Sequence, residues 1–435
     1  MMKKCISWLG LCMLALGMIN AAGQPPPTLT LQQAETVALT NHPQIFAARY
    51  NALASQQAVR AVRSRYFPLA IGNITGVDAD RNTRIGAGTL QASRLFSREA
   101  EGVTIDQLIT DSGRTPNLVA SSRFQARAAN EDTQATRYDV LLGVNHAYFE
   151  VLRAQDLLKV AKETVAERGV VQDQVATMVR HKLKSELDLS FANVNLAQGR
   201  LLQIQTQNNL DARQAQLTRA MGLENRQAYR LQGEPLPPTP PPSSAPLVAV
   251  AMANRPELIA LRFQQQSAYK FQHAEKDLSY PTIIAEGDAG YIPEIAQLTR
   301  PTLIPDHYEA AAVNIEIPIF NGHLFAARRT AALMRAREAD QNLRDMQERI
   351  ARDVRLAYYA AVTGYQQISV TAQLLDQAKL ALALAQGRYN LGLSSIVALT
   401  QAQLSETRAE VQAVNAKYDF QNENAVLQYQ TGTLK

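Results

Sequence analysis

The sequence is poor in several residue types, and each shortage excludes a kind of protein. Only two cysteines occur among the 435 residues, Cys5 and Cys12, and both lie close to the N-terminus. If that segment is removed, no cysteine is left for a disulfide bond, a catalytic thiol or a metal site. Aromatic residues make up only 6% of the chain, whereas hydrophobic residues, with a large share of Ala and Leu, make up 46%. This balance favours long helices that pack through small side chains over an aromatic-rich globular core.

The chain also has no large excess of charge of either sign. The chain has 44 Lys and Arg against 39 Asp and Glu, a formal net charge of +5, and no basic cluster of the kind that binds nucleic acid. Long hydrophobic runs are absent after the N-terminal segment, where no stretch reaches the ~18 apolar residues that a transmembrane helix needs. We therefore expect neither a nucleic-acid partner nor a helical membrane anchor.

The N-terminal segment has the order of charge, apolar core and small residues that is typical of a secretory signal peptide. Lys3 and Lys4 precede an uncharged, mainly apolar run over residues 6–19, and small residues follow. A run of about 14 residues is too short to span a bilayer comfortably as a permanent helix. We expect cleavage near Ala22, so that residues 1–22 form a signal peptide; a buried N-terminal helix is the alternative.

The rest of the chain is a duplicated unit. Between the copies, residues 234–246 hold seven of the 19 prolines, which is typical of an extended linker. We predict a first repeat over residues 23–233 and a second over residues 247–435. The matched segments include Asn41-His42-Pro43 with Asn254-Arg255-Pro256, Phe67-Pro68 with Tyr280-Pro281, Ala147-Tyr148-Phe149 with Ala357-Tyr358-Tyr359, and Gly222 with Gly432.

The sequence pattern of each repeat predicts the same elements in the same order: a helix, two strands, a very long helix, a short break and a last helix. The very long helices are expected from about Thr115 to His181 and from Leu324 to Asn390, each roughly 100 Å in length. In the second of them an apolar seam with alternating steps of four and three residues runs from Ile350 to Tyr389. Ten of the twelve equivalent positions in the first helix are apolar too. A sustained period of about 3.5 residues is the signature of a coiled coil.

The predicted strands have one apolar and one polar face. Runs of about ten residues with this alternation match the strands of a transmembrane barrel, although a soluble β-sandwich has the same period. Four strands cannot close a barrel, because the smallest membrane barrels have about eight, so strands in lipid require an oligomer. The apolar sets are Phe67, Leu69 and Ile71; Val103, Ile105 and Ile109; Ile283, Ala285, Gly287, Ala289 and Tyr291; and Val313, Ile315, Ile317 and Ile319. The candidate lumen-facing residues are Glu286, Asp288, Asn314 and Glu316.

Residue types that carry chemistry are not arranged as sites. The six histidines show no metal-ligand spacing, and no P-loop occurs. Glu286 and Asp288 alternate along one strand face, so we do not interpret them as an acid–base pair. We expect no enzymatic activity, no cofactor and no metal site.

The sequence resembles the bacterial outer membrane efflux proteins, the TolC-like channels. The resemblance rests on Asn41-x-Pro43 and its repeat, on Ile315-x-Ile317-Pro318-Ile319-Phe320-Asn321-Gly322, and on Arg388-Tyr389-x-x-Gly392-x-x-Ser395 before Ala402-Gln403. It implies a mainly α fold in which a long coiled-coil helical barrel continues a β-barrel in the outer membrane of a Gram-negative bacterium. It further implies a homotrimer with twelve barrel strands, four from each chain, and cargo delivered by an inner-membrane pump through a periplasmic adaptor.

The resemblance also assigns roles to the breaks after the long helices. The breaks would be periplasmic tips that dock the adaptor, although simple helix–helix turns are the alternative. The first tip departs from the pattern, because it has Lys182 where the second has Gly392. The docking candidates are Leu183, Lys184 and Ser185 in the first tip and Gly392, Leu393, Ser394 and Ser395 in the second.

The periplasmic aperture of the family lies just after the tip, where many members carry an aspartate. Gln401 occupies that place here, so we predict a more weakly cation-selective aperture that depends on Asp188. The alternative for Asp188 is a favourable charge in the first turn of its helix.

A periplasmic coiled-coil adaptor or scaffold without a channel is the second function that the pattern allows. An adaptor would carry one helical hairpin between Gly-rich β domains, whereas this chain carries two matching long-helix units. An exit duct is therefore the favoured prediction. The sequence does not reveal whether the cargo is a drug, a metal ion, another organic compound or a polypeptide.

Overall fold

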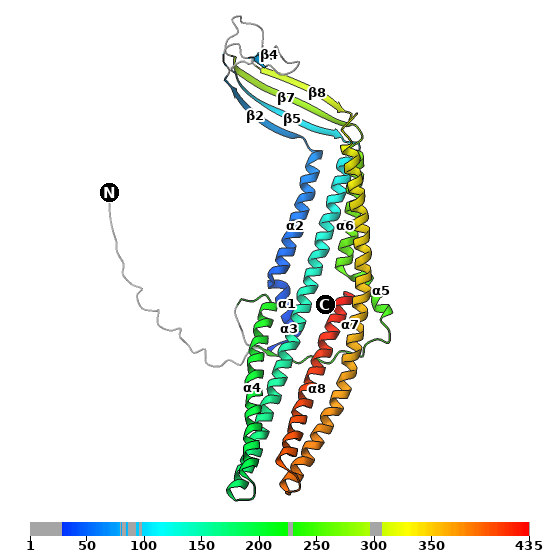
Figure 1. Ribbon diagram of the computed structural model, residues 1–435. Coiled ribbons are helices and arrows are strands. Elements are labelled where there is room, and N and C mark those ends of the chain that lie inside the picture. The colour runs from blue at the N-terminus through cyan, green and yellow to red at the C-terminus, as the bar shows by residue number, and fades with distance from the viewer. Residues whose placement is uncertain are drawn as a thin grey trace, which may run out of the picture.

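The computed structural model describes residues 28–78, 80, 84–85, 93–94, 98–224, 229–295 and 307–434. The predicted signal peptide lies outside these residues. Figure 1 shows a long molecule with a sheet at one end, two helical hairpins at the other, and shorter elements beside the middle.

The elements follow one order in both repeats. The first repeat contains β1 (Thr28–Leu29), α1 (Leu31–Asn41), α2 (Pro43–Arg63), a 3₁₀ turn (Ser64–Tyr66), β2 (Leu69–Val77), β3 (Arg84–Ile85), β4 (Ser93–Arg94), β5 (Arg98–Thr110), α3 (Arg114–Arg180), α4 (Glu186–Ala220) and β6 (Arg230–Leu231). The second contains α5 (Ala245–Asn254), α6 (Pro256–Asp277), β7 (Thr282–Ile295), β8 (His307–Glu316), α7 (Leu324–Asn390) and α8 (Ile396–Thr431).

The predicted long helices are confirmed. α3 and α7 each contain 67 residues and lie within one residue of the expected limits. The equivalent positions of the two helices differ by 210 residues along their whole length. All twelve predicted seam positions of each helix are buried or half-buried, so the 3.5-residue period marks the packed side.

The helices start where the local sequence satisfies their first N–H groups. Thr30 and Gln33 form a capping box at α1, and the side chain of His42 caps α2, whose first residue is Pro43. The matching start at α6 has Pro256 in the same place. The Asn-x-Pro motif of each repeat therefore marks a break between two consecutive helices.

The helices lie side by side in an order that changes at mid-height. Next to the sheet, α3 lies between α2 and α6, and α6 lies between α3 and α7. Toward the far end, α3 lies between α4 and α8, and α8 packs against α7. Each long helix thus runs the length of the molecule, and two shorter helices stack end to end beside it.

The main sheet is antiparallel, with strand order β2-β5-β7-β8. The neighbours β5 and β7 come from different repeats, so the sheet joins the two copies. Thr104 pairs with Asp288, Asp106 with Glu286, and Thr282 with Glu316. Directly paired residues share a face of the sheet, so these polar side chains lie on one face, which also carries Ile284.

Three details of the predicted strand pattern are wrong. Residues 317–320 are not part of β8, which ends at Glu316, because Pro318 has no N–H to continue the ladder. Phe67 lies before β2, and Leu69 and Ile71 pair with Asp106 and Thr104, so these two residues lie on the polar face. Ile109 falls at a register shift between β5 and β7 and does not extend the apolar face.

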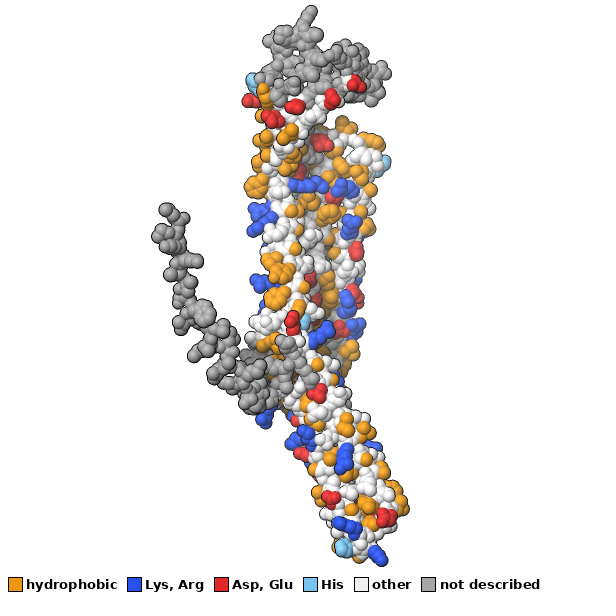
Figure 2. Space-filling view, turned by 90° about the vertical axis from the view of Figure 1, so that its left-hand side faces the viewer, with side chains coloured by type: hydrophobic (Ala, Val, Ile, Leu, Met, Phe, Trp, Pro, Cys, Tyr) orange, Lys and Arg blue, Asp and Glu red, His pale blue; other side chains and the backbone are white. Residues whose placement is uncertain are grey.

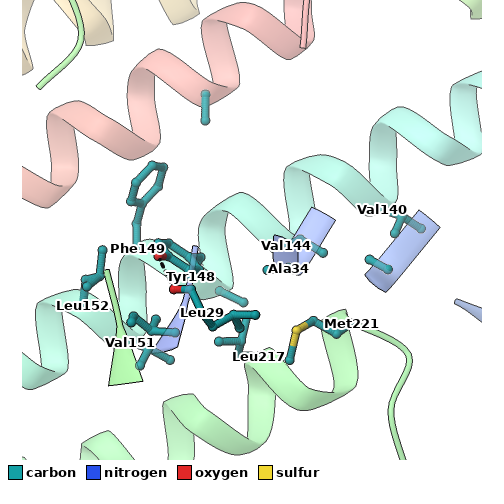
Figure 3. Packing of buried hydrophobic residues seen from close by; sticks show 14 of the residues in the cluster. Leu29, Ala34, Val140, Val144, Tyr148, Phe149, Val151, Leu152, Leu217 and Met221 are labelled. Carbon is teal, nitrogen blue, oxygen red and sulfur yellow. Dashed lines mark hydrogen bonds between the residues drawn. The ribbon is translucent and has the colours of Figure 1, made fainter. Parts of the chain in front are cut away.

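The largest described core lies at mid-height, beside β1. Tyr148 of α3 is fully buried there, and its hydroxyl donates to the carbonyl oxygens of Leu29 (2.9 Å) and Gln232 (2.7 Å). β1 and β6 form a two-residue parallel pair beside it. Leu217 of α4 and Met221, directly after α4, belong to the same cluster, as Figure 3 shows. The sequence pattern did not predict this strand pair, which is too short to show a period.

In each repeat, the end of the last helix packs against the Asn-x-Pro break near the start of the same repeat, at mid-height of the molecule. Gly222 follows α4 and packs against the start of α2; an added Cβ would lie 2.7 Å from the Cα of His42. Gly432 follows α8 and packs against Asn254 in the same way, with a Cβ contact of 3.1 Å. A larger residue at either glycine would collide with the Asn-x-Pro break of its own repeat.

Candidate functional site

The two tips have the same geometry. Lys182 and Gly392 both adopt a left-handed backbone conformation, with φ of 58° and 73°. The next N–H reaches back to the same helical carbonyl in each case: Leu183 N donates to Met178 O and Leu393 N to Arg388 O, both at 2.8 Å. This is the Schellman arrangement that ends many helices. The lysine in the first tip therefore does not change the turn.

The serines that end the tips start the next helices. Ser185 Oγ accepts from the N–H of Asp188 at 3.2 Å, and Ser395 Oγ accepts from the N–H of Ala398 at 3.3 Å. Both tips expose large apolar side chains at equivalent places: Leu183 is 73% exposed and Leu393 is 66% exposed. Lys184 is half-buried and Ser394 also lies within the tip segment that was predicted to dock a partner.

One contact joins the two tips. The ammonium group of Lys184 lies 4.4 Å from the ring centre of Tyr389, at the end of α7. The Tyr389 ring is buried among Val175, Ala192 and Leu399, so this cluster draws on all four helices. Burial, together with the charge of Asp188, raises the pKa of Tyr389. The tips of one chain are therefore held together.

The predicted aperture residues lie on different helices. Asp188 is in the first turn of α4, where its carboxylate accepts from the N–H of Ser185 (3.1 Å) and from the Ser185 hydroxyl (2.7 Å). Gln401 is exposed on α8. Asp188 thus lies in the first turn of α4, as the alternative expected, and in addition completes a capping box with Ser185. Its proposed role in ion selectivity remains a prediction.

The four predicted lumen residues share one face of the sheet. Glu286 and Asp288 of β7 lie on the same side as Asn314 and Glu316 of β8, because Asn314 pairs with Ile284. The opposite face carries the pairs Ile283–Ile315 and Ala285–Val313. β7 and β8 therefore have one polar and one apolar face, as the wall of a membrane barrel needs.

The described part of the chain has two open edges, that is, two sides where the outermost strand or helix has no neighbour within the chain. The edges run through the sheet, the helices next to the sheet and the helices toward the tips. β2 and β8 are the edge strands of the sheet, α2 and α7 are the edge helices next to it, and α4 and α7 are the edge helices toward the tips. Exposed apolar side chains lie on each of these elements: Ile71 and Ile74; Val313 and Ile315; Tyr50 and Leu53; Val194, Leu201 and Ile204; and Leu356, Tyr359, Val370 and Leu374.

The exposed face of α7 repeats positions that are buried in α3. Val370 is 63% exposed, whereas the equivalent Val160 is 8% exposed. Tyr359 is exposed, and the equivalent Phe149 is buried. α3 has neighbours on both sides, whereas α7 has them on one. Sequence reasoning missed these edges because the repeat pattern does not show which copy lies inside the bundle.

A buried polar layer crosses the lower bundle. Arg168 of α3 donates to the carbonyl oxygen of Asn195 (2.9 Å) on α4 and to the hydroxyl of Thr407 (3.2 Å) on α8. Burial, with the carboxylates of Glu410 and Glu167 nearby, raises the pKa of Glu406 to about 7. Arg168 is one of the two polar residues among the twelve seam positions of α3. This departure from the apolar pattern was the sequence signal that could have predicted the polar layer.

Within the described residues, no helix is long and apolar enough to cross a membrane. The same residues contain no group of three or more His, Cys, Asp or Glu side chains placed to hold a metal ion. On the face drawn in Figure 2, Lys and Arg are interspersed with Asp and Glu along the helices, and no large patch of one sign occurs.

The sequence matches the family model described as outer membrane efflux protein twice, over residues 36–223 and over residues 247–433. The chain belongs to the outer membrane efflux protein family. A relative in this family, the outer membrane protein TolC of Vibrio cholerae, is 23% identical over 402 residues, which cover 91% of this chain and 88% of TolC. The probable outer membrane lipoprotein SilC of Salmonella typhimurium is 22% identical over 356 residues, which cover 77% of this chain and 73% of SilC.

Solved structures have the same fold. A membrane protein from Pseudomonas aeruginosa superposes with a TM-score of 0.79 at 20% identity, over 92% of this chain and 93% of that one. CusC gives 0.77 at 19% identity over 92% of each chain. VceC of Vibrio cholerae gives 0.77 at 16% identity over 92% of this chain and 96% of that one.

Family membership fixes the class of function and the location. The efflux family consists of channel proteins, so this chain is an outer-membrane exit duct with a large periplasmic helical part. The predicted fold class, with its internal duplication, is confirmed, and the alternative of a periplasmic adaptor is excluded.

Proposed function

We propose that three copies of this chain form the passive exit duct of a tripartite efflux or type I secretion system. In this proposal the duct receives cargo from an inner-membrane pump through a periplasmic adaptor. The observation that carries the proposal is the pair of open edges, which run through strands and helices alike on the same two sides of the chain. Two different edges that meet head to tail generate a ring.

The duplication supplies a register for that ring. Inside one chain the long helix of repeat one packs against the last helix of repeat two, α3 against α8. The same contact, repeated between chains, joins α7 of one copy to α4 of the next. Val370 and Leu374 then become buried, as the equivalent Val160 and Thr164 are within the chain, and the exposed residues of α4 become at least half-buried, as their equivalents on α8 are.

The number of copies follows from the strands and the resemblance. Four strands are too few to close a barrel, and three copies bring the total to the twelve that the resemblance implies. The polar face with Glu286 and Asp288 then lines the lumen, and the face with Val313 and Ile315 lies against outer-membrane lipid.

The tips are the docking surfaces in this proposal. Exposed leucines at equivalent places in matching turns are typical of a surface that binds a partner, because isolated tips gain nothing from them. Each chain presents two such turns, so a ring of three presents six. The adaptor then contacts Leu183 to Ser185 at one kind of tip and Gly392 to Ser395 at the other.

A disulfide cross-link between copies tests the ring. Within the chain, His146 of α3 contacts Asn422 of α8, with 3.3 Å between the side-chain nitrogen and oxygen. An offset of 210 residues converts this pair to Leu356 and Ala212, which are both exposed. The chain has no cysteine beyond Cys12, so Leu356→Cys with Ala212→Cys introduces the cysteines of the mature protein.

The expected result is a covalent trimer on a non-reducing gel, with uncross-linked protein for either single variant. The same purified material should conduct ions in planar bilayers. A monomer by light scattering in mild detergent, with no cross-linked species, would contradict the proposal.

A further inference from the structure

The segment between the repeats has a defined conformation. From Glu234 to Pro242 every residue is either proline or directly precedes one. Proline fixes φ near −65°, and the residue before it is held in the extended region. A chain that meets both conditions over this length forms a polyproline II helix, which has three residues per turn. We call residues 232–242 the strap.

The burial of the strap repeats every third residue. Leu231, just before it, is buried, and Glu234, Pro237 and Pro240 are half-buried, whereas all its other residues are exposed. This is the period of polyproline II, so one edge of the strap faces the helices and the other two face outward. Figure 1 shows the strap running across the helices at mid-height from β6 to α5.

The strap is anchored by two hydrogen bonds, one at Glu234 on its inner edge and one at Thr239 on the adjacent exposed edge. The side-chain nitrogen of Gln421 on α8 donates to the carbonyl oxygen of Glu234 at 3.1 Å. The hydroxyl of Thr239 donates to the hydroxyl of Tyr365 on α7, also at 3.1 Å. The anchors hold the strap in its extended form, so a partner would not have to order it.

The outer edges carry no charged residue. Pro235, Pro238 and Pro241 follow one another at intervals of three residues on one exposed edge. Leu236, which is 47% exposed, lies on the next edge with Pro242 and the anchored Thr239. The single charged residue between 232 and 242, Glu234, belongs to the inner edge.

We propose that the outer edge of the strap docks a periplasmic protein through a groove lined with aromatic side chains. Proline rings at intervals of three residues stack on such grooves, and the preformed helix lowers the entropic cost of binding. A glycan would need hydrogen-bond donors, and this segment offers few, because six of the nine residues from 234 to 242 are prolines without an N–H.

The site is separate from the tips. Gln421 lies 26 residues along α8 from Ser395, which corresponds to about 40 Å. A protein bound at the strap therefore does not compete with an adaptor bound at the tips. The proposal goes beyond the exit-duct function and does not depend on the adaptor.

Two matched double variants test the proposal on the purified full-length trimer. Pro238→Ala with Pro241→Ala changes the outer edge, and Pro237→Ala with Pro240→Ala changes the inner edge by the same chemistry. The probe is an isolated WW domain, which binds polyproline II through an aromatic groove, and its affinity is measured by fluorescence anisotropy. We expect the outer variant to lose at least tenfold in affinity and the inner variant to bind as the wild type does.

A second measurement uses the absence of cysteine in the mature chain. Pro238→Cys labelled with benzophenone-maleimide is irradiated in whole cells, and cross-linked peptides are mapped by mass spectrometry. An adduct on an aromatic residue of another periplasmic protein supports the proposal. An adduct on a second copy of this chain or on peptidoglycan overturns it, as does equal binding of the WW domain to both double variants or no binding to the wild type.

The channel itself provides the control. Bilayer conductance and the Leu356–Ala212 cross-link report on the ring and do not involve the strap. If the ring forms and conducts but the strap binds nothing, only the strap proposal fails.

Discussion

The two long helices have the same length and the same seam, yet they occupy different environments. α3 lies between neighbours from both repeats, and its side chains at Phe149 and Val160 are buried. α7 lies at the edge of the chain, and the equivalent Tyr359 and Val370 are exposed. The duplicated pattern therefore encodes one surface that is covered within the chain and one that is open, which a second copy covers in the proposed ring.

The largest effect should separate folding from assembly. Val160→Glu places a charge inside the bundle without a partner, which costs about 3–5 kcal/mol, so we expect little folded protein. Val370→Glu with Leu374→Glu places charges on the open edge, so the chain should fold and remain monomeric. Circular dichroism measures the folding, and light scattering in detergent measures the assembly. Trimers of the α7 variant would show that this face is not part of the ring.

The second prediction concerns the ends of the same helices. Gly392→Val with Leu393→Glu changes the tip that follows α7, where a β-branched residue cannot easily adopt a φ of 73° and a carboxylate replaces an exposed leucine. We expect export in cells to be abolished while trimers form normally. Export assays with quantified trimer are the measurement, and Val250→Glu, an exposed position on α5 far from the tips, is the control. Normal export would mean that no partner docks at this tip.

The third prediction concerns pH and the polar layer that α3 shares with α8. The pKa of Glu406 is raised to about 7 in the folded chain, above its ordinary value of 4.5, so the folded state favours the protonated form. Its contribution to stability is fully present below pH 4.5 and is lost as the pH rises through 7. Glu406→Gln should therefore raise the melting temperature at pH 8 relative to the wild type and change it less at pH 5. An equal change at both pH values would contradict the shift.

A smaller effect should appear at the first tip. Lys182 has a φ of 58°, a conformation that costs a side chain about 1 kcal/mol relative to glycine. Lys182→Gly should stabilise the tip by about that amount, and Gly392→Ala should destabilise the other tip by a similar amount. Hydrogen exchange of the Leu183 and Leu393 amides measures both changes. Unchanged exchange in both variants would show that the two turns relax without cost.

The smallest expected effect is on ion selectivity. Asp188→Asn should weaken cation selectivity slightly, because the carboxylate is already engaged with Ser185, and Gln401→Asp should increase it. Reversal potentials in planar bilayers under a salt gradient measure both. If neither variant changes the potential, the aperture lies elsewhere.

Features with a periodic pattern or a turn residue could be predicted from the sequence. Features that depend on which strand or helix lies alongside could not. The seam from Ile350 to Tyr389 and the break at Gly392 have a period or a turn residue, so both could be found. The face of Leu69 could not be found, because it depends on the register with β5. The β1–β6 pair has two residues in each strand and leaves no pattern at all.

The candidate sites divide in the same way. Ser185 and Ser395 were predictable because a serine after a break is a helix-capping signal. The exposed edge of α7 was not, because an apolar residue has the same identity whether its neighbour belongs to its own chain or to another. The strap combines both cases: its prolines marked a linker, and only the burial pattern showed which edge is free.

The contacts of Gly222 and Gly432 mean that the entry and the exit of each repeat meet at one place. A break in the polypeptide within residues 232–242 would therefore leave two fragments, each with its own ends already joined. Such fragments, produced from separate genes, should find each other through the α3–α8 contact and rebuild the full chain. The molecule is in this sense a covalent dimer of half-length channel subunits.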